Sequence, residues 1–372
     1  MKAKSLRFKL IAGGILVVLI PLLAVGYFAV TRASEALQSL GREQVVNLSK
    51  DLSSMTDLVL KEELKLSTEI GSDARLQESV SAVVETGRQN AATEAQLLDK
   101  RLSGIMTSIG HDYEAIFLAD PKGTIYSDGN KGAYRDVSIA DRPYFQKAKN
   151  GKTLVGNPIK SKVTGDVVVP VASPVQNPNG EFAGILALIV KIDFIAEKIT
   201  SVKIGETGYP FLVNQKGLIL VHPNETLILE TDITQLPGME DIARAATNGQ
   251  TGVKNYIYKG DKKIGGFAPV DLTGWSVVTT QTADDFLGTA NSIRNFMTIM
   301  TVVFLGATML IVIFFSNGIS RRVMNIVDSL NRSSEQVASA SGQVASTSQS
   351  LAEGSSEQAS SLEETSSSLE EM

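Results

Sequence analysis

The stretch FLADPKGTIYSDGN at residues 117–130 recurs without a gap as FLVNQKGLILVHPN at residues 211–224. In each copy, a short apolar run leads into a polar turn that ends in glycine, and a second apolar run follows. Turn residues of this kind between two apolar runs are typical of a β-hairpin. The constant offset of 94 residues indicates a duplicated unit of helices and antiparallel strands.

Further apolar runs extend both copies of this unit. Residues 167–172 and 183–190 flank an Asn-Pro-Asn-Gly turn, and three more strands are predicted at 253–258, 263–268 and 275–280. Ahead of the strands, leucines recur at helical spacing, which predicts one long helix over residues 31–84 and a second amphipathic helix around 98–109. Strand clusters preceded by helices favour the α+β fold class, with two modules side by side.

Two uncharged segments bracket this region. Residues 10–30 and 296–315 contain 21 and 20 residues without a charge, which matches the length that a helix needs to cross a bilayer. The first is longer than the apolar core of a signal peptide, so we expect an uncleaved anchor rather than a cleaved leader. Lysine and arginine precede the first segment and follow the second, which places both termini in the cytoplasm.

Composition excludes several classes of function. The 372 residues include no cysteine and only two histidines, His111 and His222, so neither a thiol nucleophile nor a histidine-rich metal site is expected. The net charge of −5 and the lack of a long basic run argue against nucleic-acid binding. No phosphate loop, paired catalytic carboxylates or nucleophile motif stands out. We therefore expect no enzymatic activity, no cofactor and no metal.

One cluster outside the apolar segments has the chemistry of a ligand site. Arg142 is followed closely by Tyr144 and Phe145. A guanidinium offers a planar fork of donors that matches a carboxylate, and aromatic rings can shield the rest of a small ligand from water. The alternative is structural: Arg142 would close a turn through Asp141 or Asp136, and the two aromatic residues would belong to the core.

Three short segments carry a family resemblance. DRPYF at 141–145, SKVTG at 161–165 and GETGYPFLV at 205–213, together with the long helix and the two hairpin modules, resemble a double Cache sensor domain over residues 31–290. The resemblance implies that the module farther from the membrane binds a small molecule. It also implies that Arg142 takes a ligand carboxylate beside Tyr144 and Phe145. The remaining residues of the predicted ligand site are Tyr126, Ser161 and Ser173.

The chain departs from the amino-acid-binding members of that family. Ile189 stands where they place an aspartate for the ligand ammonium, Val137 where a tyrosine is common, and Ile159 and Ser161 where a tyrosine and an aspartate are usual. An isoleucine cannot pair with an ammonium, and an unpaired charge in a pocket costs several kcal/mol. The expected ligand is therefore a carboxylate without an α-ammonium, such as a small organic acid.

The C-terminal segment is rich in serine but is patterned like a coiled coil. Sixteen of its 56 residues from position 317 onward are serine, and none is proline. Leu330, Val337, Val344 and Leu351 are each seven residues apart, and a second register of sevens continues at 362 and 369. This heptad pattern favours a coiled coil over a flexible linker, and it predicts that the helix pairs with other copies of the chain. The resemblance to a sensor receptor implies a homodimer that can join larger clusters.

Acidic pairs lie near the end of the chain. Glu-Glu pairs at 363–364 and 370–371 are seven residues apart, and Glu357-Gln358 is a related pair. With their flanking small residues, they resemble the methylation sites of methyl-accepting chemotaxis receptors. This resemblance implies a methyltransferase and a methylesterase or deamidase as partners; the alternative is an ordinary solvated acidic face. The predicted methylation residues are Gln358, Glu364 and Glu371, with Glu363 and Glu370 beside them.

The sequence thus predicts a two-pass chemoreceptor of the inner membrane with a periplasmic or extracellular sensor. The hairpin that would dock the kinase CheA and the adaptor CheW is absent, so we expect a longer protein truncated in its first methylation helix. The main alternative is a Cache-type sensor histidine kinase or diguanylate cyclase whose output domain lies beyond residue 372. The expected parts are a cytoplasmic N-terminus (1–9), a transmembrane helix (10–30), the sensor (31–295; distal module about 85–200, proximal module about 201–285), a second transmembrane helix (296–315) and a coiled coil (316–372).

Overall fold

The computed structural model describes residues 3–371. These form two compact units. One comprises residues 33–291, and the other comprises the helical segments before residue 33 and after residue 291. The first unit contains both predicted hairpins and all the strands, and it is described first.

Three helices precede the strands: α1 (Ala3–Gly71), α2 (Ala74–Thr86) and α3 (Ala92–Ile109). The prediction of one helix as far as residue 84 was wrong, because α1 ends at Gly71 and α2 begins after Asp73. The carboxylate of Asp73 accepts a hydrogen bond from the backbone N–H of Leu76 at 3.0 Å. This side-chain cap satisfies a donor that a continuous helix would have used internally, so it stabilises a new helix start.

The first sheet unit is a six-stranded antiparallel sheet with the strand order β2-β1-β6-β5-β3 and with β4 paired to β5. The predicted hairpins at 117–130 and 167–190 are both present in it. Two short helices, which were not predicted, follow β2 and β6. The bounds are β1 (Tyr113–Ala119), β2 (Ile125–Asp128), α4 (Pro143–Lys149), β3 (Leu154–Val155), β4 (Ile159–Lys160), β5 (Val167–Gln176), β6 (Phe182–Lys191) and α5 (Ile192–Thr200).

The second sheet unit is a five-stranded antiparallel sheet with the strand order β8-β7-β11-β10-β9. Its predicted hairpin and its three later strands are present, with ends that differ by a few residues from the predicted ones. The bounds are β7 (Tyr209–Val213), β8 (Ile219–Val221), the 3₁₀ turns η1 (Glu225–Leu227) and η2 (Ile233–Gln235), α6 (Glu240–Thr247), β9 (Gly252–Tyr258), β10 (Asp261–Val270) and β11 (Trp275–Thr282).

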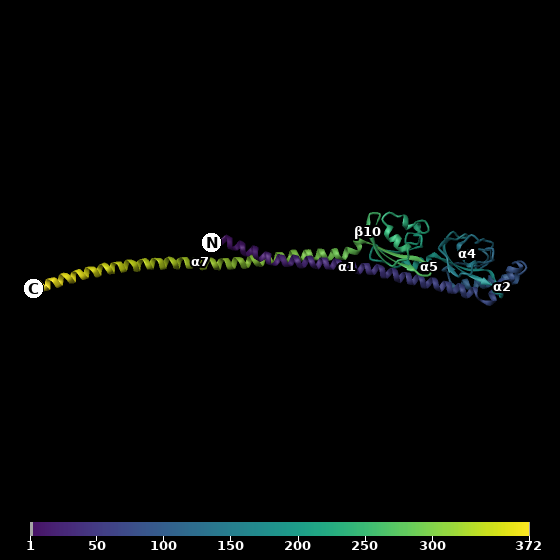
Figure 1. The fold of residues 1–372 in the computed structure, drawn as a ribbon, viewed down its shortest axis with the longest axis horizontal. Helices are drawn as coiled ribbons and strands as arrows, with labels where there is room; N and C mark the ends of the chain where they lie inside the picture. The colour runs from purple at the N-terminus through teal and green to yellow at the C-terminus, as the bar shows by residue number, and fades with distance from the viewer. Residues whose placement is uncertain (1–2, 372) are drawn as a thin grey trace. The chain divides into compact units, whose positions relative to one another are not determined.

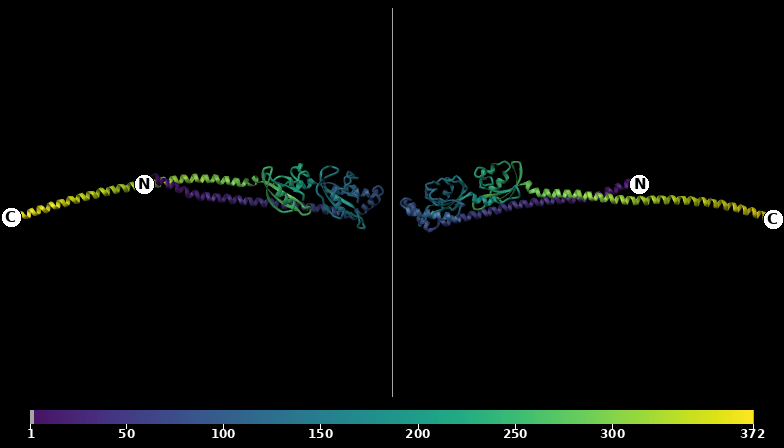
Figure 2. Two further views of the ribbon diagram at one scale, coloured as in Figure 1. Left: turned by 45° about the horizontal axis from the view of Figure 1, so that its top comes forward. Right: turned by 180° about the vertical axis from the view of Figure 1, so that it is seen from behind.

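Each sheet has one face toward α1 and one face away from it. Figures 1 and 2 show α1 running beside both sheets within this unit. Leu52 and Leu60 of α1 share one continuous apolar cluster with Leu188 of the first sheet and Val277 of the second. The faces that are turned away from α1 form two separate apolar clusters, one on each sheet. Because side chains alternate along a strand, neighbouring residues contribute to different clusters.

A single tryptophan joins the two sheet units. Trp275 on β11 is 1% exposed, and its indole Nε1–H donates to Oδ1 of Asn157 in the first unit at 2.8 Å. Trp275 therefore belongs to the core and links the two sheets.

The second compact unit consists of helix. Two helices of the described chain are long and apolar enough to cross a membrane: Ile11–Gly71, which belongs to α1, and Asn291–Glu371, which belongs to α7 (Ala283–Glu371). The serine-rich tail is helical as far as Glu371, as predicted. Its heptad residues Leu330, Val337 and Leu351 are 61%, 65% and 71% exposed in the single chain, so the pairing of this helix stays a prediction.

Candidate ligand-binding site

The face of the first sheet that is turned away from α1 contains a small enclosed cavity of about 30 Å³. A water molecule needs about 10–15 Å³ measured in this way, so the cavity has room for one or two waters. Strands β1, β2, β4, β5 and β6, helix α4 and the loops beside them contribute its walls. The lining residues are Phe117, Ile125, Tyr134, Val137, Ile139, Arg142, Tyr144, Ile159, Ser161, Lys162, Val163, Val168 and Ile189.

Three of the predicted ligand-binding residues line this cavity: Arg142, Tyr144 and Ser161. They come from separate parts of the chain, since Arg142 and Tyr144 lie at the start of α4 and Ser161 directly follows β4. The same cavity also contains the apolar residues that replace the polar positions of the amino-acid-binding family members, namely Val137, Ile159 and Ile189.

The other three predicted residues lie elsewhere. Phe145 is 1% exposed and belongs to the apolar cluster around the cavity, but it does not line the cavity. Tyr126 and Ser173 were placed wrongly in the predicted site, because strand alternation turns them to the α1 face. Tyr126 packs in the cluster on that face, and the hydroxyl of Ser173 donates to the carbonyl oxygen of Ser67 on α1 at 2.9 Å.

Arg142 presents its guanidinium at the cavity from the N-terminal end of α4. Pro143 occupies the first turn of this helix, where its fixed φ favours a helix start. One N–H of the guanidinium donates to the carbonyl oxygen of Lys160 at 3.1 Å. Within the described part of the chain, no carboxylate forms an ion pair with Arg142. The other N–H groups of the Arg142 guanidinium therefore remain available as hydrogen-bond donors to an anionic ligand.

Asp141, which the structural alternative paired with Arg142, is bound by a different cation. The ammonium of Lys162 lies 2.7 Å from Oδ1 of Asp141 and also donates to the carbonyl oxygen of Ser138 at 2.9 Å. The hydrogen bond from Lys162 lowers the pKa of the Asp141 carboxyl. Lys162 thus binds Asp141, one of the two carboxylates that the alternative offered to Arg142.

A buried carboxylate beside the cavity was not predicted from the sequence. Glu114 on β1 is 7% exposed and accepts hydrogen bonds from three hydroxyls: those of Tyr134, of Ser161 at 2.5 Å and of Thr164 at 2.9 Å. Burial, and then the hydrogen bond to Glu114, raise the pKa of Tyr134. The signal in the sequence was an acidic residue inside an otherwise apolar strand. Glu114 holds two walls of the cavity, Tyr134 and Ser161, in place.

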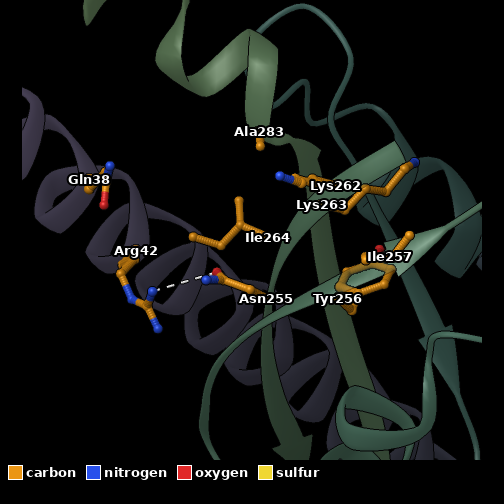
Figure 3. Close-up of a pocket in the computed structure, with 9 residues that line it drawn as sticks. All are labelled: Gln38, Arg42, Asn255, Tyr256, Ile257, Lys262, Lys263, Ile264 and Ala283. Atoms are coloured by element: carbon orange, nitrogen blue, oxygen red, sulfur yellow. Dashed lines mark hydrogen bonds between the residues drawn. The ribbon is translucent and has the colours of Figure 1, made fainter. Parts of the chain in front are cut away.

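A more open groove of about 430 Å³ lies between α1 and the edge of the second sheet (Figure 3). Arg42 of α1 reaches across it to Oδ1 of Asn255 at 3.5 Å, and Ile264 points from the sheet toward the helix. None of the predicted ligand-binding residues lines this groove. It lacks the combination of an enclosing aromatic wall and an oriented guanidinium that is found in the first sheet unit.

Comparisons with known proteins agree with the fold. A model of the Cache domain matches residues 29–290. The methyl-accepting chemotaxis protein McpA of Bacillus subtilis (strain 168) is 26% identical over 342 residues, which cover 91% of this chain and 47% of the relative. The chain spans about half the length of this relative.

Two solved structures share the fold. The sensory domain of the Campylobacter jejuni chemoreceptor Tlp3 with isoleucine bound has a TM-score of 0.52 at 15% identity, and the match covers 68% of this chain and 97% of that one. The ligand-binding domain of Mlp24 with asparagine has a TM-score of 0.51 at 20% identity, and the match covers 69% and 98%. The family model covers most of the chain, which belongs to the Cache domain family and is homologous to methyl-accepting chemotaxis proteins of Bacillus and Pseudomonas.

Proposed function

We propose that this protein is a transmembrane chemoreceptor whose Cache domain binds a small extracellular carboxylate. Residues 10–30 and 296–315 would cross the inner membrane, and the two sheet units would form the distal and proximal modules of a periplasmic or extracellular sensor. The two long apolar helices and the basic residues at their cytoplasmic ends support this arrangement. The family match over the intervening region supports a sensory role.

The observation that carries the ligand assignment is the guanidinium of Arg142. Arg142 has intermediate exposure and lines the small cavity, and its guanidinium engages a carbonyl oxygen, while the nearby carboxylate of Asp141 is held by Lys162. A carboxylate ligand would supply a bidentate, charge-assisted partner for the remaining donors. Tyr144 would shield the rest of the ligand from water.

Ile189 favours an organic acid over an amino acid. Its side chain lines the same cavity and offers no acceptor for an α-ammonium. Glu114 is a buried carboxylate bonded to two residues that line the cavity, but it already accepts three hydroxyl hydrogen bonds. An ammonium would have to displace some of them, and a buried acceptor is costly to leave without its partners. A ligand without an α-ammonium avoids that cost.

The small cavity supplies a means of signalling. A volume of about 30 Å³ is too small for an organic acid of several heavy atoms, so binding requires the walls to move. The ligand would then have different affinities for the closed and the opened sensor. This difference in affinity is the free energy that can shift a receptor between two states.

The output would act through the C-terminal coiled coil. As a dimer, its helices would bring several glutamates together, and esterifying Glu364 or Glu371 would remove like charges from the bundle. At a surface dielectric, each site changes helix–helix repulsion by about 0.1–1 kcal/mol. Several sites together can bias a bundle that has two packings. The proposed partners are a methyltransferase and a methylesterase or deamidase, with CheA and CheW acting through a downstream hairpin.

The ligand assignment is tested by thermal unfolding of the whole chain in detergent, followed by the fluorescence of Trp275. An organic acid held a hundredfold above its Kd should add about 2.7 kcal/mol of stability, which raises Tm by several degrees. Arg142→Ala should abolish the shift, whereas substitution of Arg75, an exposed arginine of α2 that does not line the cavity, by alanine should keep it. Stabilisation by amino acids but not by organic acids would refute the Ile189 argument. An unchanged shift in Arg142→Ala would refute the proposed site.

The chemoreceptor and kinase alternatives differ in their covalent modification. Mass spectrometry of the C-terminal peptide, isolated from cells that have the methyltransferase, should show methyl esters at Glu364 or Glu371 and deamidation at Gln358. Unmodified glutamates after exposure to an active ligand would contradict the adaptation role and favour the sensor-kinase or cyclase alternative.

A further inference from the structure

The second sheet unit contains its own enclosed cavity at the place equivalent to the first. Both cavities have a volume of about 30 Å³. Phe211, Ile219 and Ile233 line the second cavity, and each lies 94 residues after a residue that lines the first. The offset is the same as that of the repeated hairpin sequence. The duplication of the fold has therefore duplicated the cavity.

The walls of the second cavity are largely aromatic. Tyr209, Phe211, Tyr256 and Tyr258 line it together with His222. The His222 ring lies edge-on to Tyr209, with ring centroids 5.1 Å apart, and it is tilted against Phe211 at 5.8 Å. Such rings suit the apolar or aromatic body of a small ligand. Aliphatic side chains complete the lining: Ile219, Leu227, Ile233, Leu236 and Met239.

A cation lies at the edge of this aromatic wall. Lys263 itself lines the open groove beside α1, but its ammonium lies 5.5 Å from the ring centroid of Tyr209 and 5.9 Å from that of Tyr258, two rings that do line the second cavity. Burial lowers the pKa of Lys263, which shows that its charge is partly desolvated. In the region that the structure describes, no carboxylate forms an ion pair with this lysine. A partly buried ammonium without an acidic partner is suited to bind an anion.

His222 adds a donor beside this cation. Its Nδ1 accepts the backbone N–H of Asn224 at 2.8 Å, and burial lowers the pKa of its imidazole. The ring is therefore neutral at neutral pH, and the proton must reside on Nε2. The structure shows a capping contact through one nitrogen and leaves the other as a hydrogen-bond donor.

We propose that this second cavity binds a small carboxylate with an aromatic or aliphatic body, separately from the ligand of the first sheet unit. The ring wall takes the body, and the Lys263 ammonium and the Nε2–H of His222 take the carboxylate. The first cavity offers a guanidinium fork to a polar acid, whereas the second offers a single ammonium beside a wall of aromatic rings. A ligand of several heavy atoms must displace part of segment 222–239, which contains the short turns η1 and η2.

The test uses the whole chain in detergent with Arg142→Ala as the background, so that the first cavity cannot account for binding. The probes are benzoate, phenylacetate and hexanoate, each compared with its neutral amide, and unfolding is followed by Trp275 fluorescence. At least one carboxylate should raise Tm by several degrees, and its amide should not. Lys263→Met should raise the Kd of that carboxylate by about tenfold or more, because a charge-assisted contact is lost.

A matched control and a second variant make the result decisive. Lys254→Met removes an exposed lysine from β9, so it should leave the Kd unchanged. His222→Phe keeps an aromatic ring in the wall but removes the N–H donor, so it should weaken carboxylate binding without a change of charge, and it replaces Lys263→Met if that variant does not fold. The proposal is overturned if none of the three carboxylates stabilises the Arg142→Ala protein. Equal binding by Lys263→Met and Lys254→Met would overturn it too. Neither result would bear on binding at Arg142.

Discussion

Gly266 on β10 allows α1 to pack directly against the second sheet. A Cβ atom at this position would lie 2.3 Å from the carbonyl oxygen of Val45 and 2.9 Å from Oγ of Ser49, both on α1. Atoms cannot approach so closely, so Gly266→Ala must push the helix and the sheet apart. Val45 is 1% exposed, and its backbone cannot rotate away as a flexible side chain would.

The cost of this separation follows from the contacts around the glycine. The hydroxyl of Thr279 donates to the carbonyl oxygen of Val45 at 2.8 Å, and it lies 2.8 Å from the hydroxyl of Ser49. Overpacking a core position costs about 1–3 kcal/mol, and each stretched hydrogen bond about 0.5–1.5 kcal/mol. We therefore expect Gly266→Ala to destabilise the unit of residues 33–291 by about 2–6 kcal/mol. For a unit of this size, Tm would fall by about 4–24 °C.

The assay is a melting curve of the whole chain in detergent, read from the fluorescence of Trp275. Gly104→Ala is the matched control, because a Cβ at this helical position meets no atom within 4 Å. Alanine is the better helix former by about 1 kcal/mol, so Gly104→Ala should keep or raise Tm. If Gly266→Ala melts within about 2 °C of the wild type, the close packing of α1 on β10 is not a main source of stability.

Two further substitutions test other contacts between the elements. Burial raises the pKa of Glu63, so its protonated form stabilises the fold below the unfolded pKa, and this contribution is lost as pH rises through the folded pKa. Glu63→Gln should remove that part of the pH dependence of Tm, and identical pH profiles for both proteins would contradict the assignment. Asn157→Ala leaves the Trp275 indole N–H without its acceptor, which should cost about 1–3 kcal/mol and shift the fluorescence maximum. An unchanged spectrum and Tm would show that this contact does not couple the two sheet units.

The hairpins could be predicted because their turns are stabilised by local contacts. Oδ1 of Asp120 accepts the backbone N–H groups of residues 122 and 124, both at 2.9 Å. Asn177 and Asn214 each make the same pair of contacts, to the residues two and four positions later. This turn chemistry depends on residue type within five positions, so it is visible in a sequence. The end of α1 at Gly71 also had a signal in the sequence, because the helix-capping residues Ser72 and Asp73 follow it. The helical spacing of the leucines nevertheless favoured one continuous helix as far as residue 84.

The candidate site was harder to predict, because its parts meet only through the fold. Arg142 and Tyr144 are neighbours on one short helix, and they were found together. Glu114 was missed because its partners Ser161 and Thr164 are 47 and 50 residues away. Tyr126 and Ser173 failed for another reason, since a single-residue error in strand phase places a side chain on the opposite face of the sheet.

The phase of β1 also suggests how the cavity and α1 could influence each other. Glu114 holds the cavity wall through Ser161 at 2.5 Å, whereas the adjacent Tyr113 donates its hydroxyl to the carboxylate of Glu63 on α1, at 2.8 and 2.7 Å from its two oxygens. Neighbouring residues of a strand point to opposite faces, so these two contacts lie on either side of the same backbone. A ligand that moves Ser161 must either break its bond to Glu114 or shift β1, and a shift of β1 would move Tyr113 with it. Weakening the Glu63 contact should therefore change the ligand affinity at Arg142, although Glu63 does not line that cavity.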